Sequence, residues 1–136
     1  LLVEEIQHSI TTALNYEELQ PYAKALGEKL QMTQGVLAHL VSFAMKGKYQ
    51  EYLADATIFM ELIGTIVIAW QWLNLATVAK QALLTGNTTY SAEFYESNIH
   101  TMKFFFKYEL SRTTGLAEIL KSSEMLTLPK EKELIA

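Results

Sequence analysis

The stretch from Leu53 to Leu84, LADATIFMELIGTIVIAWQWLNLATVAKQALL, decides the fold of this chain. Apolar residues recur along it at three- and four-residue spacing, which is the period of an α-helix. A helix that is apolar on nearly every side is either a core helix or a membrane span. Because Glu61, Gln71 and Asn74 interrupt the run, only Leu62 to Trp70 lacks a larger polar side chain, and a bilayer requires roughly 20 apolar residues. The sequence therefore predicts the buried central helix of a bundle.

Composition points to one globular domain. The chain has 136 residues, half of them hydrophobic, which suits a single packed core. Its net charge of −4 lacks the basic excess that is typical of a nucleic-acid binder. With no cysteine, it has neither disulfides nor thiolate metal sites, which fits a reducing compartment and a cytoplasmic protein. It begins in mid-pattern at Leu1, without a secretory segment, and we expect it to be a piece of a longer protein.

Three further helices are predicted around the central one. The first is too short to be stable alone and must pack on a neighbour. The second carries a heptad seam, the pattern of near-antiparallel helix packing, and ends at Gly47. The fourth follows a stop at Gly86 and is expected to break near Gly115. On it we expect these residues to point inward: Phe94, Tyr95, Ile99, Met102, Phe105 and Phe106.

The predicted architecture is all-α, an up-down bundle of about four helices with a long central helix. The helices are expected at about 1–15, 21–46, 49–85 and 90–121. These form a bundle at residues 1–121, in which the central helix lies between the second and the fourth. Residues 122–136 contain Pro129 and a charge run, and are predicted to be a flexible tail.

Three residues of the central helix are predicted to be packing or interface positions. Gly64, with Ala69, is expected where another helix comes close, so that Gly64→Leu would destabilise the domain by about 1–3 kcal/mol through overpacking. Trp70 and Trp72 lie on different faces of the helix, and we expect one of them to contact another element or subunit. We also expect the isolated chain to expose apolar surface and to self-associate.

Motifs for catalysis or metal binding are few. Di-iron bundles use two Glu-x-x-His pairs, and only Glu5-Ile6-Gln7-His8 matches here, so no metal site is predicted. The scattered single glycines do not form a phosphate-binding loop. Glu61 is a candidate functional carboxylate, but an exposed or hydrogen-bonded position explains it better. Lys103, Lys107 and Arg112 form a basic strip that suits a phosphate, although a solvated face explains it better.

One part of the chain resembles a known family. The run from Tyr52 to Ala82, followed by Phe94-Tyr95 and Phe104-Phe105-Phe106, resembles the helical C-terminal extension of one branch of the acyl-CoA dehydrogenases. The residues that carry the resemblance are Tyr52-Leu53-Ala54 after the Gly47 stop, Leu62-x-Gly64 with Val67, Ala69-Trp70, Trp72-Leu73, Ala76 and Ala79. The likeness spans about Leu1 to Leu120.

The resemblance implies a parent enzyme in which an FAD-containing core oxidises an acyl-CoA to the 2-enoyl-CoA. In that family a glutamate beside Gly-Thr takes the α-proton. The nearest match here, Tyr95-Glu96-Ser97, lies in mid-helix and lacks the glycine, so no catalytic or cofactor-binding residue is transferred to this chain. The implied role is an accessory domain, inactive and colourless alone, that packs on the upstream dehydrogenase core of a homo-oligomer.

The alternative is an independent helical interaction or oligomerisation module with no enzymatic role. A third class, peripheral attachment to a membrane, needs a basic amphipathic helix. None is evident in this sequence, so we expect no membrane partner.

Overall fold

The computed structural model describes residues 1–45, 47 and 49–122, and this part of the chain is helical with no strand. The helices are α1 (Leu2–Ala13), α2 (Gln20–Met45), α3 (Tyr49–Thr85), α4 (Ala92–Tyr108) and α5 (Thr113–Lys121), with short 3₁₀ turns η1 (Glu17–Leu19) and η2 (Leu110–Arg112). This confirms the predicted all-α bundle with a long central helix.

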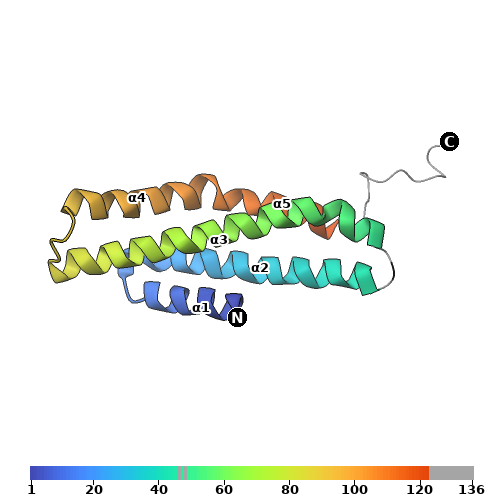
Figure 1. Cartoon of the computed structure of the whole chain (residues 1–136), viewed down its shortest axis with the longest axis horizontal. Coiled ribbons are helices and arrows are strands. Elements are labelled where there is room, and N and C mark those ends of the chain that lie inside the picture. The colour runs from blue at the N-terminus through green and yellow to red at the C-terminus, as the bar shows by residue number, and fades with distance from the viewer. Residues whose placement is uncertain (46, 48, 123–136) are drawn as a thin grey trace.

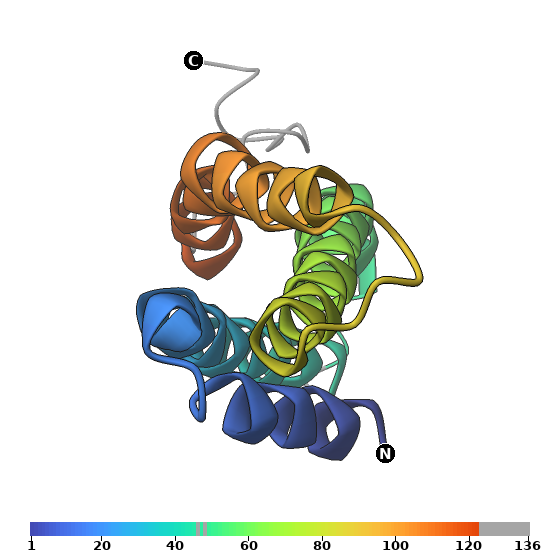
Figure 2. The same ribbon diagram turned by 90° about the vertical axis from the view of Figure 1, so that its left-hand side faces the viewer.

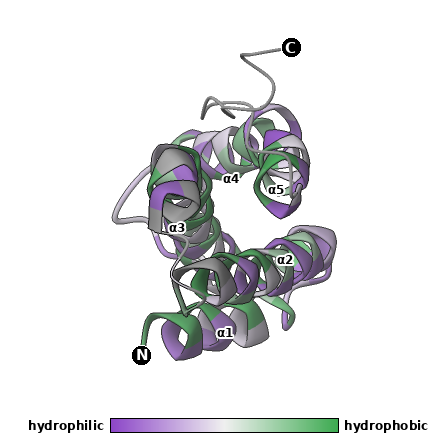
Figure 3. Ribbon diagram, turned by 90° about the vertical axis from the view of Figure 1, so that its right-hand side faces the viewer, coloured by the Kyte–Doolittle hydropathy of each residue, from purple (hydrophilic) through white to green (hydrophobic). Residues whose placement is uncertain are grey.

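The longest helix, α3, lies between α2 and α4, as predicted (Figure 1). It also contacts α1 and α5, and α5 returns to pack on α2. Seen along its length, the bundle has α1 on the outside, beside α2 and α3 (Figure 2). Along the bundle, α5 continues beyond the end of α4 (Figure 1), and the opposite end view shows hydrophobic and hydrophilic segments alternating along the helices (Figure 3).

The core side of α3 is a single row of buried residues. Leu62, Ile66, Ala69, Leu73 and Ala76 recur every three or four positions, and each exposes at most 2% of its surface. This spacing places them on one face of the helix. Burying one large aliphatic side chain contributes about 1.5–3 kcal/mol, so this row explains why α3 packs with this face inward.

Both predicted glycine stops are confirmed. Gly47 and Gly86 adopt positive φ values of 79° and 71°, a conformation that glycine takes without steric cost just beyond a helix end. After the second stop, the Asn87 side chain accepts a hydrogen bond from the Thr89 backbone N–H. The Ser91 hydroxyl then caps α4 by accepting from the Phe94 N–H at 3.1 Å.

The fourth predicted helix is two helices, so the predicted break is present, but it lies at η2, a few residues before Gly115. The chain tightens into η2 just after α4, whereas Gly115 lies within α5 and is exposed. Leu110 and Thr113 are both fully buried, and the Thr113 hydroxyl donates to the Leu110 carbonyl at 2.5 Å. The 3₁₀ turn brings both residues inward. Of the predicted tail, residues 123–136 lie outside the described residues.

By length and composition, the part of α3 from Asp55 to Thr85 is apolar enough to cross a membrane, which the interrupted apolar run did not predict. One such helix is weak support for a span, because the core helix of a soluble bundle passes the same test. Of the most apolar stretch of 18 residues within this helix, only 33% is buried in this chain. The helix therefore has a packed face and an uncovered apolar face.

Candidate functional site

The uncovered face of α3 runs along most of the helix, and we call it the α3 stripe. Its large aliphatic side chains are 47–66% exposed: Leu53, Met60, Ile68, Leu75 and Val78. Thr57, Gly64 and Gln71 lie in the same line between them, because these positions also recur at helical spacing. None of these positions carries a charge, but Glu61, exposed one helical turn from Thr57 and Gly64, borders the stripe.

Gly64 lies in the middle of the α3 stripe, and its predicted close approach to another helix of this chain is wrong. A Cβ atom at this position would meet no described atom within 4 Å. The prediction failed because a helix that is apolar all round gives the same sequence signal on its packed and its uncovered face. Ala69, in contrast, is fully buried, on the core side of α3.

The two tryptophans of α3 are both half-buried and pack against the core. The Trp70 indole N–H donates to the Ser9 hydroxyl of α1 at 2.7 Å. Trp70 therefore fixes the short first helix to the centre of the bundle. A role for Trp70 or Trp72 in a contact between subunits stays a prediction.

A second uncovered surface lies on α4 and the residues just before it, and we call it the α4 aromatic row. It consists of Tyr90, Phe94, Phe104 and Tyr108, each about half exposed. The ring centres of Tyr90 and Phe94 are 4.7 Å apart, and so are those of Phe104 and Tyr108. Phe94 was expected to point inward and does not. The inward positions Tyr95, Ile99, Met102 and Phe106 are confirmed as buried.

An open cleft of about 760 Å³ lies between the start of α2 and the flank of α4. Its lining residues are Pro21, Tyr22 and Ala25 from α2 and His100, Lys103, Phe104, Phe106, Lys107 and Tyr108 from α4. Two half-exposed rings of the α4 aromatic row thus form part of its wall. Two residues of the predicted basic strip, Lys103 and Lys107, lie at this cleft, whereas Arg112 does not line it.

Each cleft lysine lies near an aromatic ring. The ammonium group of Lys103 is 6.0 Å from the centre of the Tyr22 ring, and that of Lys107 is 5.1 Å from the Tyr108 ring. Such contacts are worth about 0.5–1 kcal/mol at exposed sites. The Tyr22 ring in turn meets Phe106 edge to face at 5.7 Å. The cleft therefore combines an aromatic wall with a cationic rim.

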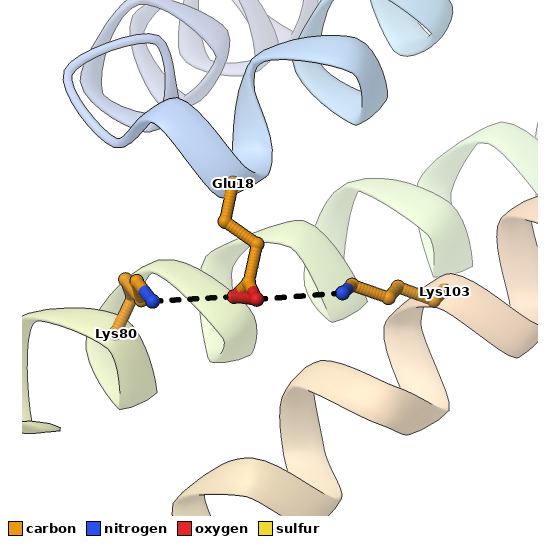
Figure 4. Close-up of polar contacts among 3 residues, drawn as sticks. All are labelled: Glu18, Lys80 and Lys103. Atoms are coloured by element: carbon orange, nitrogen blue, oxygen red, sulfur yellow. Dashed lines mark hydrogen bonds and ion pairs between the residues drawn. The ribbon is translucent and has the colours of Figure 1, made fainter.

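Glu18 connects three elements beside this cleft (Figure 4). Its carboxylate lies 3.3 Å from the ammonium group of Lys80 on α3 and 3.5 Å from that of Lys103 on α4. Burial raises the pKa of Glu18, but the hydrogen bonds and charges of the two lysines outweigh burial and lower it below 4.5 overall. Glu18 therefore partly neutralises Lys103 and holds η1 against α3 and α4.

Asp55 is a buried carboxylate that sequence reasoning missed. It is 5% exposed, near the beginning of α3. Burial raises its pKa above the usual 3.8, and the electrostatic interaction with His39 on α2 is a smaller effect in the opposite direction. The available signal was an acidic residue inside the apolar run from Leu53 to Met60.

A family profile described as acetyl-CoA dehydrogenase C-terminal like matches residues 2–129. The chain belongs to this family. The match covers nearly all of the sequence and agrees with the resemblance that the central helix and its flanking motifs indicated. Comparison with curated proteins and with solved structures finds no match.

Family membership raises the question of whether this C-terminal domain holds a flavin or a metal. Glu96, in the nearest match to the family's catalytic motif, is exposed on α4, and it does not line the cleft. Glu61 is likewise exposed, on α3. Among the described residues, no group of three His, Asp or Glu side chains is placed to hold a metal ion. The residues present do not fit a flavin site, and we assign none to this domain.

Proposed function

We propose that this chain is the accessory C-terminal helical domain of an FAD-dependent acyl-CoA dehydrogenase. In this proposal it packs against the upstream dehydrogenase core of its own chain and takes part in subunit contacts. Family membership supports the parent enzyme. The observation that carries the packing role is the α4 aromatic row, because half-exposed aromatic side chains beside a cleft are typical of the centre of a protein interface.

The chemistry of the parent enzyme belongs to its core in this proposal. A flavin held by that core would supply the redox chemistry of acyl-CoA oxidation, and a glutamate of the core would serve as the base. The residues of this domain instead pack against the core and stabilise the assembly. The α4 aromatic row supplies apolar contact area, and Lys107 supplies positive charge at its edge. The core surface that fits this combination is apolar with an acidic rim.

Hydroxyl-radical footprinting of the parent enzyme and of this chain alone tests the proposal. We expect Phe104 and Tyr108 to be modified several-fold more slowly in the parent enzyme, because the core covers them. Met45, which is 83% exposed at the end of α2, provides an internal control and should stay reactive. Equal modification of the aromatic row in both samples would favour the independent interaction module and contradict our proposal.

A further inference from the structure

A small apolar cavity lies between α1, α2 and α3, outside the surfaces that the proposed function uses. Its volume is about 80 Å³, and its walls include Ile6, Leu30, Phe59, Ile63, Ile66 and Val67. Packed protein cores contain few voids larger than a water molecule, so a cavity of this size is a candidate binding site. We propose that it binds the methyl end of an alkyl chain.

The chemistry of the walls selects an apolar ligand. A water molecule inside a protein needs about two to four polar partners, whereas the surface of this cavity is entirely apolar. The Thr33 hydroxyl, which belongs to a lining residue, donates to the Lys29 backbone carbonyl at 2.8 Å and is satisfied there. A dry apolar cavity takes up xenon or a hydrocarbon, because such a ligand leaves water and gains dispersion contacts with the walls.

The size of the cavity limits how much hydrocarbon can enter it. In another protein, an apolar cavity of about 150 Å³ holds one benzene molecule. With about 80 Å³, the cavity in this chain has roughly half that volume and room for about three or four carbon atoms. The ligand group that fits is therefore the end of an alkyl chain, not an aromatic ring.

The cavity opens on one side, which favours a chain over a free small molecule. Leu2 at the start of α1 and Leu37 on α2 both line the cavity, and each is 44% exposed. Gln34, one helical turn before Leu37, lines it as well and is also exposed. A chain longer than the cavity can therefore pass out between the two leucines and keep its polar head group in water.

Methyl NMR of the isoleucine side chains tests the site, because Ile6, Ile63 and Ile66 all line the cavity. The probes are xenon, 1-propanol, 1-butanol and 1-hexanol. We expect saturable shifts of these three methyl signals, whereas Ile99, buried on α4, should not shift. Affinity should rise about four-fold from 1-propanol to 1-butanol, the effect of burying one further methylene. 1-Hexanol should bind at least as tightly, since its chain can leave through the opening.

Two variants of Val67, a half-buried wall residue, change the cavity in opposite directions. Val67→Phe fills it, and we expect the affinity for xenon and for 1-butanol to fall several-fold. Val67→Ala enlarges it and should admit benzene, which the natural chain excludes. Val78→Phe, at an exposed position of α3 outside the cavity, is the matched control and should leave binding unchanged. Circular dichroism of each variant checks that it folds.

Three results would overturn the inference. Equal shifts at Ile99 and at the lining isoleucines would show non-specific uptake, and unchanged binding by Val67→Phe would place the ligand elsewhere. Binding of xenon without binding of 1-hexanol would show that the cavity holds only small free molecules. None of these results changes the footprint of Phe104 and Tyr108, so the inference and the proposed function fail separately.

Discussion

At Gly64 the outer surface of α3 lacks a side chain, and a Cβ atom would meet nothing within 4 Å in the described part of the chain. Gly64→Ala should therefore raise the free energy of unfolding of the monomer by about 0.5–1 kcal/mol, because alanine loses less backbone entropy in a helix. Urea denaturation at low protein concentration measures this change. Gly47→Ala is the control of opposite sign, since a φ of 79° strains a side chain and should cost about 1–2 kcal/mol.

Asp55 gives a prediction about pH. Its folded pKa is raised above 3.8 by burial, so the folded chain holds this proton more tightly than the unfolded chain. The stabilisation that results is complete below 3.8 and is lost as the pH rises through the folded pKa. Asp55→Asn does not titrate. We expect its stability relative to the natural chain to be higher at neutral pH than in acid, as thermal melts across pH would show.

The pH dependence of stability that Glu18 contributes has the opposite sign to that of Asp55. Its folded pKa is lowered, so its contribution is present above 4.5 and is lost as the pH falls through the folded value. Because the carboxylate and the lysines are partly exposed, water screens the pairs, and Glu18→Gln should cost no more than about 1 kcal/mol at neutral pH. The difference should shrink in molar salt. A cost that salt leaves unchanged would show that packing, not charge, is responsible.

At the scale of elements, α1 depends on the rest of the bundle. A helix of 12 residues is marginal in water, and α1 is held by buried Ile6 and Ala13 and by the Ser9–Trp70 hydrogen bond. Ile6→Ala should cost about 2–5 kcal/mol and should speed hydrogen exchange of the α1 amides more than that of α4. Leu2→Ala, at an exposed position, is the matched control and should change stability by less than about 0.5 kcal/mol.

The elements also show what sequence periodicity can decide. The ends of α2 and α3 were predictable because glycine marks them locally, at Gly47 and Gly86. The break between α4 and α5 was expected near Gly115, but its position at η2 was not predictable, because the apolar pattern continues through it and the turn arises from burying Leu110 and Thr113. Which face of α3 packs inward was equally unpredictable, since a helix that is apolar on all sides does not indicate which face is covered.

At the scale of the whole molecule, the candidate surfaces were predictable only in part. The spacing of Lys103 and Lys107 along one helix placed both on one strip, and both lie at the cleft. Their aromatic neighbour Tyr22 and their partner Glu18 come from elsewhere in the chain, so no local pattern indicates them. The cleft exists because the bundle brings the start of α2 beside α4, and only the fold could show this.

The last prediction concerns the division of labour in the parent enzyme. If the core holds the flavin and the catalytic glutamate, the purified chain should show no flavin absorbance near about 450 nm and should not reduce an electron acceptor with acyl-CoA. A parent enzyme that lacks this domain should keep its flavin and should still be reduced by substrate in a single turnover, while its subunits dissociate at higher concentration than before. A flavin that stays with the isolated chain through gel filtration would contradict this division.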